Sequence, residues 1–427
     1  MHESAPDKAQ PQGAARLTGR RRVWQEGAMS SQVIAPRIRG FICLNAHPAG
    51  CAANVAAEIT VARQAAPGSG LGAALVIGAS TGYGLSSLVS AVFGYGARGT
   101  AVCLERPPQG EKPASAGWYN LAAAQTRARA AGGEIAVING DAFSREIKDQ
   151  TLARLKQAGA KLDSVVYSLA APKRTDPADG VSYSSVLKPI GAPFHSKSIN
   201  LGNDQVVAVE IAPATEAEAE ATRKVMGGED LGAWVNALAE ADLLAAGCRV
   251  VAYSYIGPAL TFPIYRSGTI GRAKEDLEKT TRALSAMLAS RLGGAAWVSV
   301  NKALVTQASS AIPVVPLYIS LLYRVMKEKG THEGTAQQIA RLYRDHLAPG
   351  RRPATDAEGR IRLDDLELEA DVQARVSALW AEVSTENLSA VSDYAGFRAD
   401  FRRLFGFEVP GVDYAQPVET DVALTLG

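Results

Sequence analysis

A tyrosine and a lysine that stand nine residues apart, Tyr265 and Lys274, could together act on a carbonyl group. A tyrosine hydroxyl can donate a hydrogen bond or a proton to an oxygen that gains charge, while a lysine holds a cofactor beside it. At roughly 100° per residue, a separation of nine places two side chains on opposite faces of a continuous helix. The pair therefore requires Tyr265 to lie in a loop, which Pro263, Gly268 and Gly271 favour because they discourage helix until about residue 270. The alternative is a packed loop tyrosine and a surface lysine.

A glycine-rich stretch, residues 78–84 (Gly-Ala-Ser-Thr-Gly-Tyr-Gly), lies between an apolar run at 73–77 and a helical pattern that continues from Leu85. The apolar run predicts a short buried strand, so the glycines join a strand to the N-terminus of a helix. That geometry offers backbone N–H groups and the positive end of a helix dipole to a pyrophosphate. The G-x3-G-x-G spacing resembles that of short-chain dehydrogenases and reductases. The alternative is an ordinary glycine-rich connection.

Polar side chains follow the next strands of the pattern. Glu105 ends the second strand, where a carboxylate can accept hydrogen bonds from ribose hydroxyls and repel a 2′-phosphate, which favours NADH over NADPH. Arg98 and Arg106 weaken that preference, because either could neutralise a phosphate, and the alternative is a solvated strand end. Asp141 follows the third strand and could accept from an adenine amino group or cap the next helix. Small residues at 168–171 would let a dinucleotide approach the backbone.

These motifs lie on an alternation of apolar strands and amphipathic helices, which predicts an α/β fold with a parallel sheet covered on both faces. Strands are predicted at 73–78, 100–105, 134–139, 163–169, 248–254 and 296–302. Helices are predicted at 54–64, 83–95, 117–131, 144–158, 230–246 and 270–292, with further helical stretches within 307–346 and 362–405. Ligands of such sheets bind at the carboxyl ends of the strands.

The chain is predicted to form one enlarged NAD-binding domain over residues 33–427, preceded by a disordered extension at 1–32. A Pro/Gly-rich insertion at about 171–227 would cover the substrate, and a helical part would span about 307–427.

Composition excludes several classes of function. Lys plus Arg number 45 and Asp plus Glu 43, so a formal charge of +2 gives no reason to expect a nucleic acid or a membrane as partner. The four cysteines form no C-x-x-C pair. The spacing of Cys43, His47 and Cys51 would place them on one face of a helix, but Pro48 and Gly50 disfavour a helix there. No metal site is therefore expected. Without a long uncharged apolar run, the reducing cytoplasm is the expected location.

Three features together resemble the FabV-type enoyl-acyl-carrier-protein reductases and the trans-2-enoyl-CoA reductases. They are the Y-x8-K pair, the glycine-rich stretch, and an N-terminal segment that contains Pro36-Arg37-Ile38-Arg39-Gly40-Phe41-Ile42 and His47-Pro48-Ala49-Gly50-Cys51. The resemblance runs from about residue 34 to the end and implies an enlarged Rossmann-type reductase with a substrate-covering region. It also implies a monomer. Glu275 departs from the second basic residue expected beside Lys274.

The resemblance implies a role for each matching residue. Tyr265 would be the catalytic acid, Lys274 would hold the cofactor and favour tyrosinate character in Tyr265, and Tyr255 would contact the substrate thioester. NADH would be bound by Gly78, Ala79, Ser80, Thr81, Gly82, Tyr83, Leu104, Glu105, Asp141, Ala142, Leu169, Ala170, Leu304, Val305 and Thr306, with Tyr83 near the adenine and 304–306 along the nicotinamide.

The implied reaction is NADH-dependent reduction of the C2=C3 bond of a trans-2-enoyl thioester on acyl-carrier protein or CoA, the last step of fatty-acid elongation. One alternative is a short-chain-type carbonyl reductase, which the unusual Y-x8-K spacing disfavours. The other is a non-catalytic NAD-binding sensor, which would need no tyrosine–lysine pair.

Overall fold

A seven-stranded sheet forms the centre of the computed structural model, which describes residues 31–66 and 70–427. Its strand order is β14-β13-β12-β7-β4-β5-β6, and every neighbouring pair is parallel. The strands are β4 (Ala73–Ile77), β5 (Arg98–Cys103), β6 (Ile135–Asn139), β7 (Leu162–Tyr167), β12 (Leu244–Ser254), β13 (Ala295–Val300) and β14 (Ile361–Arg362). The predicted α/β fold is confirmed. Within this sheet only the two-residue β14 was not predicted, because it is too short to show a periodicity.

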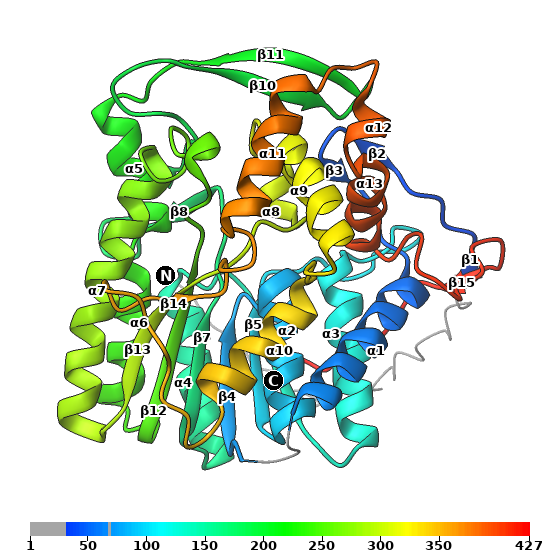
Figure 1. Cartoon of the computed structure of the whole chain (residues 1–427). Helices are drawn as coiled ribbons and strands as arrows, with labels where there is room; N and C mark the ends of the chain where they lie inside the picture. The colour runs from blue at the N-terminus through cyan, green and yellow to red at the C-terminus, as the bar shows by residue number, and fades with distance from the viewer. Residues whose placement is uncertain (1–30, 67–69) are drawn as a thin grey trace, which may run out of the picture.

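Helices cover both faces of this sheet (Figure 1). Val76 packs into one buried cluster and its neighbours Leu75 and Ile77 into another, because successive side chains of a strand point to opposite faces. The first face carries α2 (Gly82–Val89) and α3 (Ala116–Ala130), on which α1 (Pro48–Ala65) and α10 (Thr335–Leu342) pack. The second carries α4 (Arg145–Ala158), α6 (Glu229–Glu240) and α7 (Thr269–Leu292). Residues 90–94 continue α2 as a π-helix.

The start of α1 contradicts the sequence prediction. The helix begins at Pro48, where a proline is tolerated because its missing N–H would have no helical acceptor. His47 caps it, since Nδ1 accepts a hydrogen bond from the N–H of Gly50 at 3.2 Å. A Cβ at Gly50 would lie 1.7 Å from the carbonyl oxygen of Gly406, so this glycine serves a close approach between distant segments. Among the described residues, no group of three or more His, Cys, Asp and Glu is arranged to hold a metal.

The insertion and the C-terminal helices lie together above the sheet, at the top of Figure 1. The insertion contains β8 (Lys173–Thr175), β9 (Ser182–Ser184), β10 (Phe194–Asn200), β11 (Gln205–Ile211) and α5 (Glu216–Met226). The helices are α8 (Gln307–Ser310), α9 (Val315–Lys329), α11 (Ala370–Glu382), α12 (Leu388–Val391) and α13 (Tyr394–Arg403). Lys197 of β10 donates to the carbonyls of Trp380, Ala381 and Val383 at 3.0–3.2 Å, which fastens the insertion to the end of α11.

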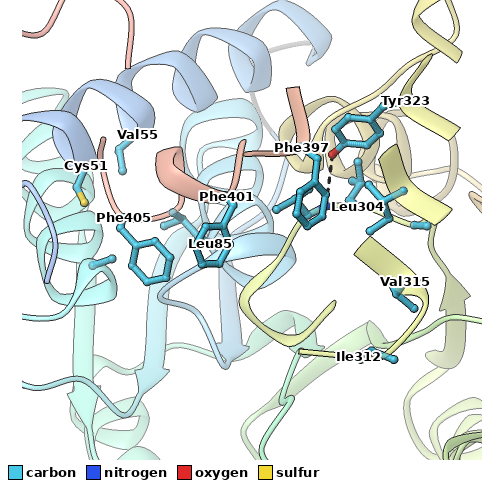
Figure 2. Packing of buried hydrophobic residues seen from close by; sticks show 14 of the residues in the cluster. Cys51, Val55, Leu85, Leu304, Ile312, Val315, Tyr323, Phe397, Phe401 and Phe405 are labelled. Atoms are coloured by element: carbon cyan, nitrogen blue, oxygen red, sulfur yellow. Dashed lines mark hydrogen bonds between the residues drawn. The ribbon is translucent and has the colours of Figure 1, made fainter. Parts of the chain in front are cut away.

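One buried cluster connects these parts, with members from Ile34 to Leu424. Figure 2 shows Phe397, Phe401 and Phe405 spaced along it, with Leu85 and Leu304 beside them. No helix in the described ranges is both long and apolar enough to cross a membrane.

The N-terminal segment is partly described. Strand β1 (Ser31–Gln32) pairs with β15 (Val418–Glu419), so the predicted disorder of residues 1–32 is wrong for its last two residues, and the remainder lies outside the described residues. Strands β2 (Ile38–Arg39) and β3 (Ile42–Cys43) form the hairpin that follows.

Candidate active site

The glycine-rich turn between β4 and α2 packs against its own backbone and against the end of β7. Gly78 has φ +85°, and a Cβ there would lie 2.5 Å from the carbonyl oxygen of Ser168. A Cβ at Gly84 would lie 1.9 Å from the carbonyl oxygen of Gly78, so only glycine fits at both positions. Thr81 is the N-cap of α2 but makes no side-chain capping bond. The first N–H groups of α2, from Gly82 onward, can therefore donate hydrogen bonds to a bound anion.

Glu105 lies beside this turn. Its Oε1 accepts a hydrogen bond from the Ser80 hydroxyl at 2.6 Å. The side chain of Asn139 binds both the N–H and the carbonyl of Glu105, at 2.7 and 2.8 Å, and so fixes its backbone. Burial raises the pKa of Glu105, while hydrogen bonds from Ser115 and Ser80 lower it. Leu104, 71% exposed, offers an apolar surface next to the carboxylate. Asn139 was not foreseen, although an amide at the end of a predicted strand was a usable signal.

The loop after β6, which contains Asp141 and Ala142, is fixed by side-chain hydrogen bonds to its backbone. Asp141 is exposed, and Ser144 rather than Asp141 is the N-cap of α4, so the capping alternative for Asp141 is wrong. The carbonyl of Ala142 accepts hydrogen bonds from Lys148 Nζ at 2.9 Å and from Trp234 Nε1 at 3.1 Å. Asp141 thus projects from a fixed loop as an exposed side chain, and its Oδ1 accepts a hydrogen bond from the N–H of Phe143 at 3.0 Å.

Residues after β7 and β13 also gather around the glycine-rich turn. The Leu169 side chain borders Gly78 (3.3 Å from a Cβ built there), and the Thr306 methyl borders Gly82 (3.7 Å). Ala170, which is exposed, follows the end of β7. Leu304 and Val305, which are buried, precede Thr306.

Tyr83 lies on the β12–β13 side of the site. Its hydroxyl donates to the carbonyl of Lys302 at 2.7 Å, and its ring lies 5.8 Å from that of Tyr253. Asp141, where the adenine was expected, follows β6 at the far edge of the sheet. The structure therefore argues against Tyr83 packing near the adenine.

Tyr265 lies in the turn before α7, as the glycines predicted. The helix begins at Thr269, and a Cβ at Gly271 would lie 2.4 Å from the carbonyl oxygen of Tyr265, so glycine lets the turn fold onto the helix. The N–H of Gly268 donates to that same carbonyl at 3.2 Å. The N–H of Thr269 donates to the carbonyl of Lys188 at 3.0 Å, which joins the turn to the insertion.

The Tyr265 side chain is buried against a second tyrosine. Its ring meets that of Tyr255 edge-on, with centroids 4.6 Å apart, and the Tyr255 hydroxyl donates to Glu367 Oε1 at 3.0 Å. Within the described ranges, the Tyr265 hydroxyl makes no hydrogen bond. Burial raises the pKa of Tyr265 and the charge of Glu367 raises it further, so the hydroxyl stays neutral. Both effects oppose the expected tyrosinate character.

Lys274 is half-buried and makes no hydrogen bond to Tyr265. Its Nζ donates to the carbonyl of Tyr253 at 3.0 Å. Burial lowers the pKa of Lys274 to about 8, against the charge of Glu278, which raises it. The two members of the Y-x8-K pair thus have separate surroundings, Lys274 at the Tyr253 carbonyl and Tyr265 at the Tyr255 ring.

Three family descriptions match successive parts of the chain. The NAD(P)H-binding domain of trans-2-enoyl-CoA reductase matches residues 33–110, and the catalytic region of trans-2-enoyl-CoA reductase matches residues 112–348. An enoyl reductase FAD-binding domain matches residues 355–418.

The residues of that last segment do not fit a flavin dinucleotide. The N-cap of α11 is Glu369 and its first turn contains Asp371. The first turn of α13 is capped by Asp393, whose carboxylate accepts from the N–H of Gly396 at 3.0 Å. Carboxylates at both helix N-termini would repel a pyrophosphate. No step of the reaction is therefore assigned to a flavin.

Relatives of known name match nearly the whole chain. An enoyl-[acyl-carrier-protein] reductase [NADH] of Flavobacterium johnsoniae is 54% identical over 90% of this chain and 96% of that protein, and one of Coxiella burnetii is 51% identical over 92% and 97%. The structure of Treponema denticola trans-2-enoyl-CoA reductase in complex with NAD is 44% identical, with TM-score 0.88 over 92% of this chain and all of that one (100%). That of Clostridium acetobutulicum trans-2-enoyl-CoA reductase in complex with NADH is 38% identical, with TM-score 0.88 over 91% and 98%. The chain belongs to the family of FabV-type enoyl-acyl-carrier-protein reductases and trans-2-enoyl-CoA reductases.

Proposed function

We infer that this chain reduces the C2=C3 double bond of trans-2-enoyl thioesters, carried on acyl-carrier protein or CoA, with NADH, as the last step of fatty-acid elongation. The names of relatives and the NADH and NAD in their solved structures support this activity. The residues fit the cofactor, because the glycine-rich turn leaves no room for a Cβ at Gly78 or Gly84 and opens onto free N–H groups of α2. Glu105, beside that turn, would accept from the ribose hydroxyls.

Tyr265 would stabilise the charge that develops on the thioester oxygen. When bound, NADH supplies a hydride to C3 of the enoyl group. The substrate then becomes an enolate, whose oxygen the neutral Tyr265 hydroxyl would meet as hydrogen-bond donor before C2 is protonated. A donor aimed at charge that exists only along the reaction lowers the barrier rather than merely tightening binding.

The other predicted residues would hold the two ligands. Lys274 and residues 304–306 would position the cofactor near the nicotinamide end, and Asp141 would reach the adenine. Tyr255 would contact the thioester through its ring and oxygen. We also propose that residues 33–427 act as one domain, as a monomer in the cytoplasm, where the four unpaired cysteines would stay reduced. Light scattering that gave a mass above that of one chain would overturn the monomer.

The single observation that carries this mechanism is the Tyr265 hydroxyl, which belongs to a residue only 5% exposed and makes no hydrogen bond within the described part of the chain. We expect Tyr265→Phe to lower kcat by ~10²–10³, because one oxyanion-type donor is lost, and to leave NADH affinity nearly unchanged. Tyr255→Phe should be milder, because its proton is already donated to Glu367. The assay is loss of NADH absorbance with a short enoyl-CoA, and cofactor affinity is read separately by fluorescence.

Three outcomes would contradict the proposal. NADH loss with ketones or aldehydes but not with enoyl-CoA would make the chain a carbonyl reductase. NADH binding without turnover of either substrate would make it a sensor. A Tyr265→Phe enzyme with near-parental kcat would remove Tyr265 as the donor.

A further inference from the structure

Glu367 lies between β14 and α11 and is a buried carboxylate next to Tyr255. Nothing in the sequence pattern marks it. Its side chain has no exposed surface (0%). Oε1 accepts hydrogen bonds from the hydroxyls of Tyr318 at 2.7 Å and Tyr255 at 3.0 Å, and Oε2 accepts from the N–H of Ala303 at 2.7 Å. A buried carboxylate is costly unless such donors satisfy it. Glu367 thus connects Tyr318 and Tyr255 to Ala303, the residue that precedes the predicted nicotinamide-binding stretch at 304–306.

A second buried charge balances Glu367. Lys302 is 2% exposed, and its ammonium donates to the carbonyl of Ala303 at 3.1 Å and lies 5.3 Å from the centre of the Tyr323 ring. Burial raises the pKa of Glu367, whereas the Ala303 N–H, the Tyr318 hydroxyl and the charge of Lys302 act against that rise and favour the carboxylate. Lys302 contributes this attraction without occupying a lone pair of Glu367.

The carboxylate dictates which way the hydroxyls donate. A carboxylate can only accept, so Tyr255 and Tyr318 must both direct their protons toward it. The Tyr318 oxygen accepts in turn from Gln373 Nε2 at 3.1 Å. Tyr255 is left with oxygen lone pairs for any further partner. The neighbouring Tyr265 keeps its proton unengaged by the described residues.

We infer that Glu367 is a positioning residue that determines which tyrosine donates to the substrate. It holds the Tyr255 proton, keeps the Tyr255 ring edge-on against Tyr265, and so leaves Tyr265 as the sole donor to the thioester oxygen. This role rests on the proposed function and extends it, because it explains why two adjacent tyrosines are not interchangeable.

Glu367→Gln tests this role with little change in volume. A glutamine has one acceptor oxygen, and the N–H of Ala303 can only donate, so the oxygen should face Ala303 and the amide N–H2 should face the tyrosine oxygens. Tyr255 must then turn its proton away from position 367, toward the site. The double variant Tyr265→Phe/Glu367→Gln should therefore have a kcat about fivefold or more above that of Tyr265→Phe, as a replacement donor recovers part of the ~10²–10³ loss.

Two controls identify the recovered donor. Adding Tyr255→Phe to the double variant should abolish the recovery, and Glu367→Asp, which remains acceptor-only, should give none. A merely structural Glu367 would instead give losses that multiply, and that result would overturn the inference.

A further measurement needs no change at Glu367 and so does not depend on whether its variants fold. With Glu367 intact, Tyr255 cannot replace Tyr265, so Tyr255→Phe/Tyr265→Phe should lose at most about threefold beyond Tyr265→Phe, the size of a small packing change. A further loss of tenfold or more would show that Tyr255 donates beside Glu367 and would overturn the inference. Failure of the proposed function is distinct, because the parent enzyme itself would then not reduce enoyl-CoA.

Discussion

Replacing Glu105 with alanine should both weaken NADH binding and narrow the preference over NADPH. Oε1 of Glu105 accepts a hydrogen bond from the Ser80 hydroxyl at 2.6 Å, and a carboxylate has further lone pairs that could accept from a ribose hydroxyl. Losing one charge-assisted hydrogen bond costs about 1.5–3 kcal/mol, or about a tenfold to hundredfold rise in the Kd for NADH. NADPH loses no such bond, and its 2′-phosphate no longer faces a carboxylate, so its Kd should stay equal or fall.

Ser80→Ala is the matched control, because it removes the partner of Oε1 and keeps the charge. Its Kd for NADH should rise by no more than about fivefold, the equivalent of one neutral hydrogen bond of about 1 kcal/mol, and its NADH preference should persist. Fluorescence titration gives both Kd values, and kcat/KM with each cofactor gives the preference. If Glu105→Ala keeps the parental NADH/NADPH ratio, Glu105 is only a solvated strand end.

Two further predictions concern Lys274 and the glycine-rich turn. Because burial lowers the pKa of Lys274 to about 8, its charge is lost above that pH. The Kd for NADH should therefore rise about fivefold between pH 8 and 9, as the charged fraction falls, and Lys274→Met should flatten this dependence; an equally steep rise in the variant would assign the titration elsewhere. Gly84→Ala places a methyl 1.9 Å from a backbone oxygen and should lower the free energy of unfolding in urea by about 1–3 kcal/mol or more. Gly232→Ala, on α6 with 3.5 Å to its nearest neighbour, should not destabilise, and equal losses at the two glycines would refute the steric argument.

The sequence predicted those elements whose cause is local. The central strands are continuous apolar runs, and the turn before α7 follows from Pro263, Gly268 and Gly271, each of which acts on its own backbone. The start of α1 was missed because a glycine is required at position 50 by the close approach of the carbonyl of Gly406, which is far away along the chain. A helix-breaking residue cannot be distinguished by sequence from one that serves a close approach.

The candidate site divides in the same way. Residues 78–84 and Glu105 could be assigned because strand ends and glycine spacing fix where they lie. Glu367 could not, because Asp364-Asp365-Leu366-Glu367 has the composition of a solvated acidic stretch. Its role depends on hydrogen-bond donors that only the folded chain brings together: the hydroxyls of Tyr255 and Tyr318 and the N–H of Ala303.

The C-terminal segment supplies one charged residue to the surroundings of each member of the Y-x8-K pair. In a Y-x3-K pair both side chains share one helical face, whereas here Tyr265 precedes α7 and Lys274 lies on it. Glu367 adjoins Tyr265 through Tyr255. Arg360, from the same segment, lies 3.5 Å from Glu278, whose charge raises the pKa of Lys274 against burial. Residues 355–418 therefore act on both side chains through buried ion pairs and hydrogen bonds, so a change in this segment should alter turnover even though it offers no site for a flavin.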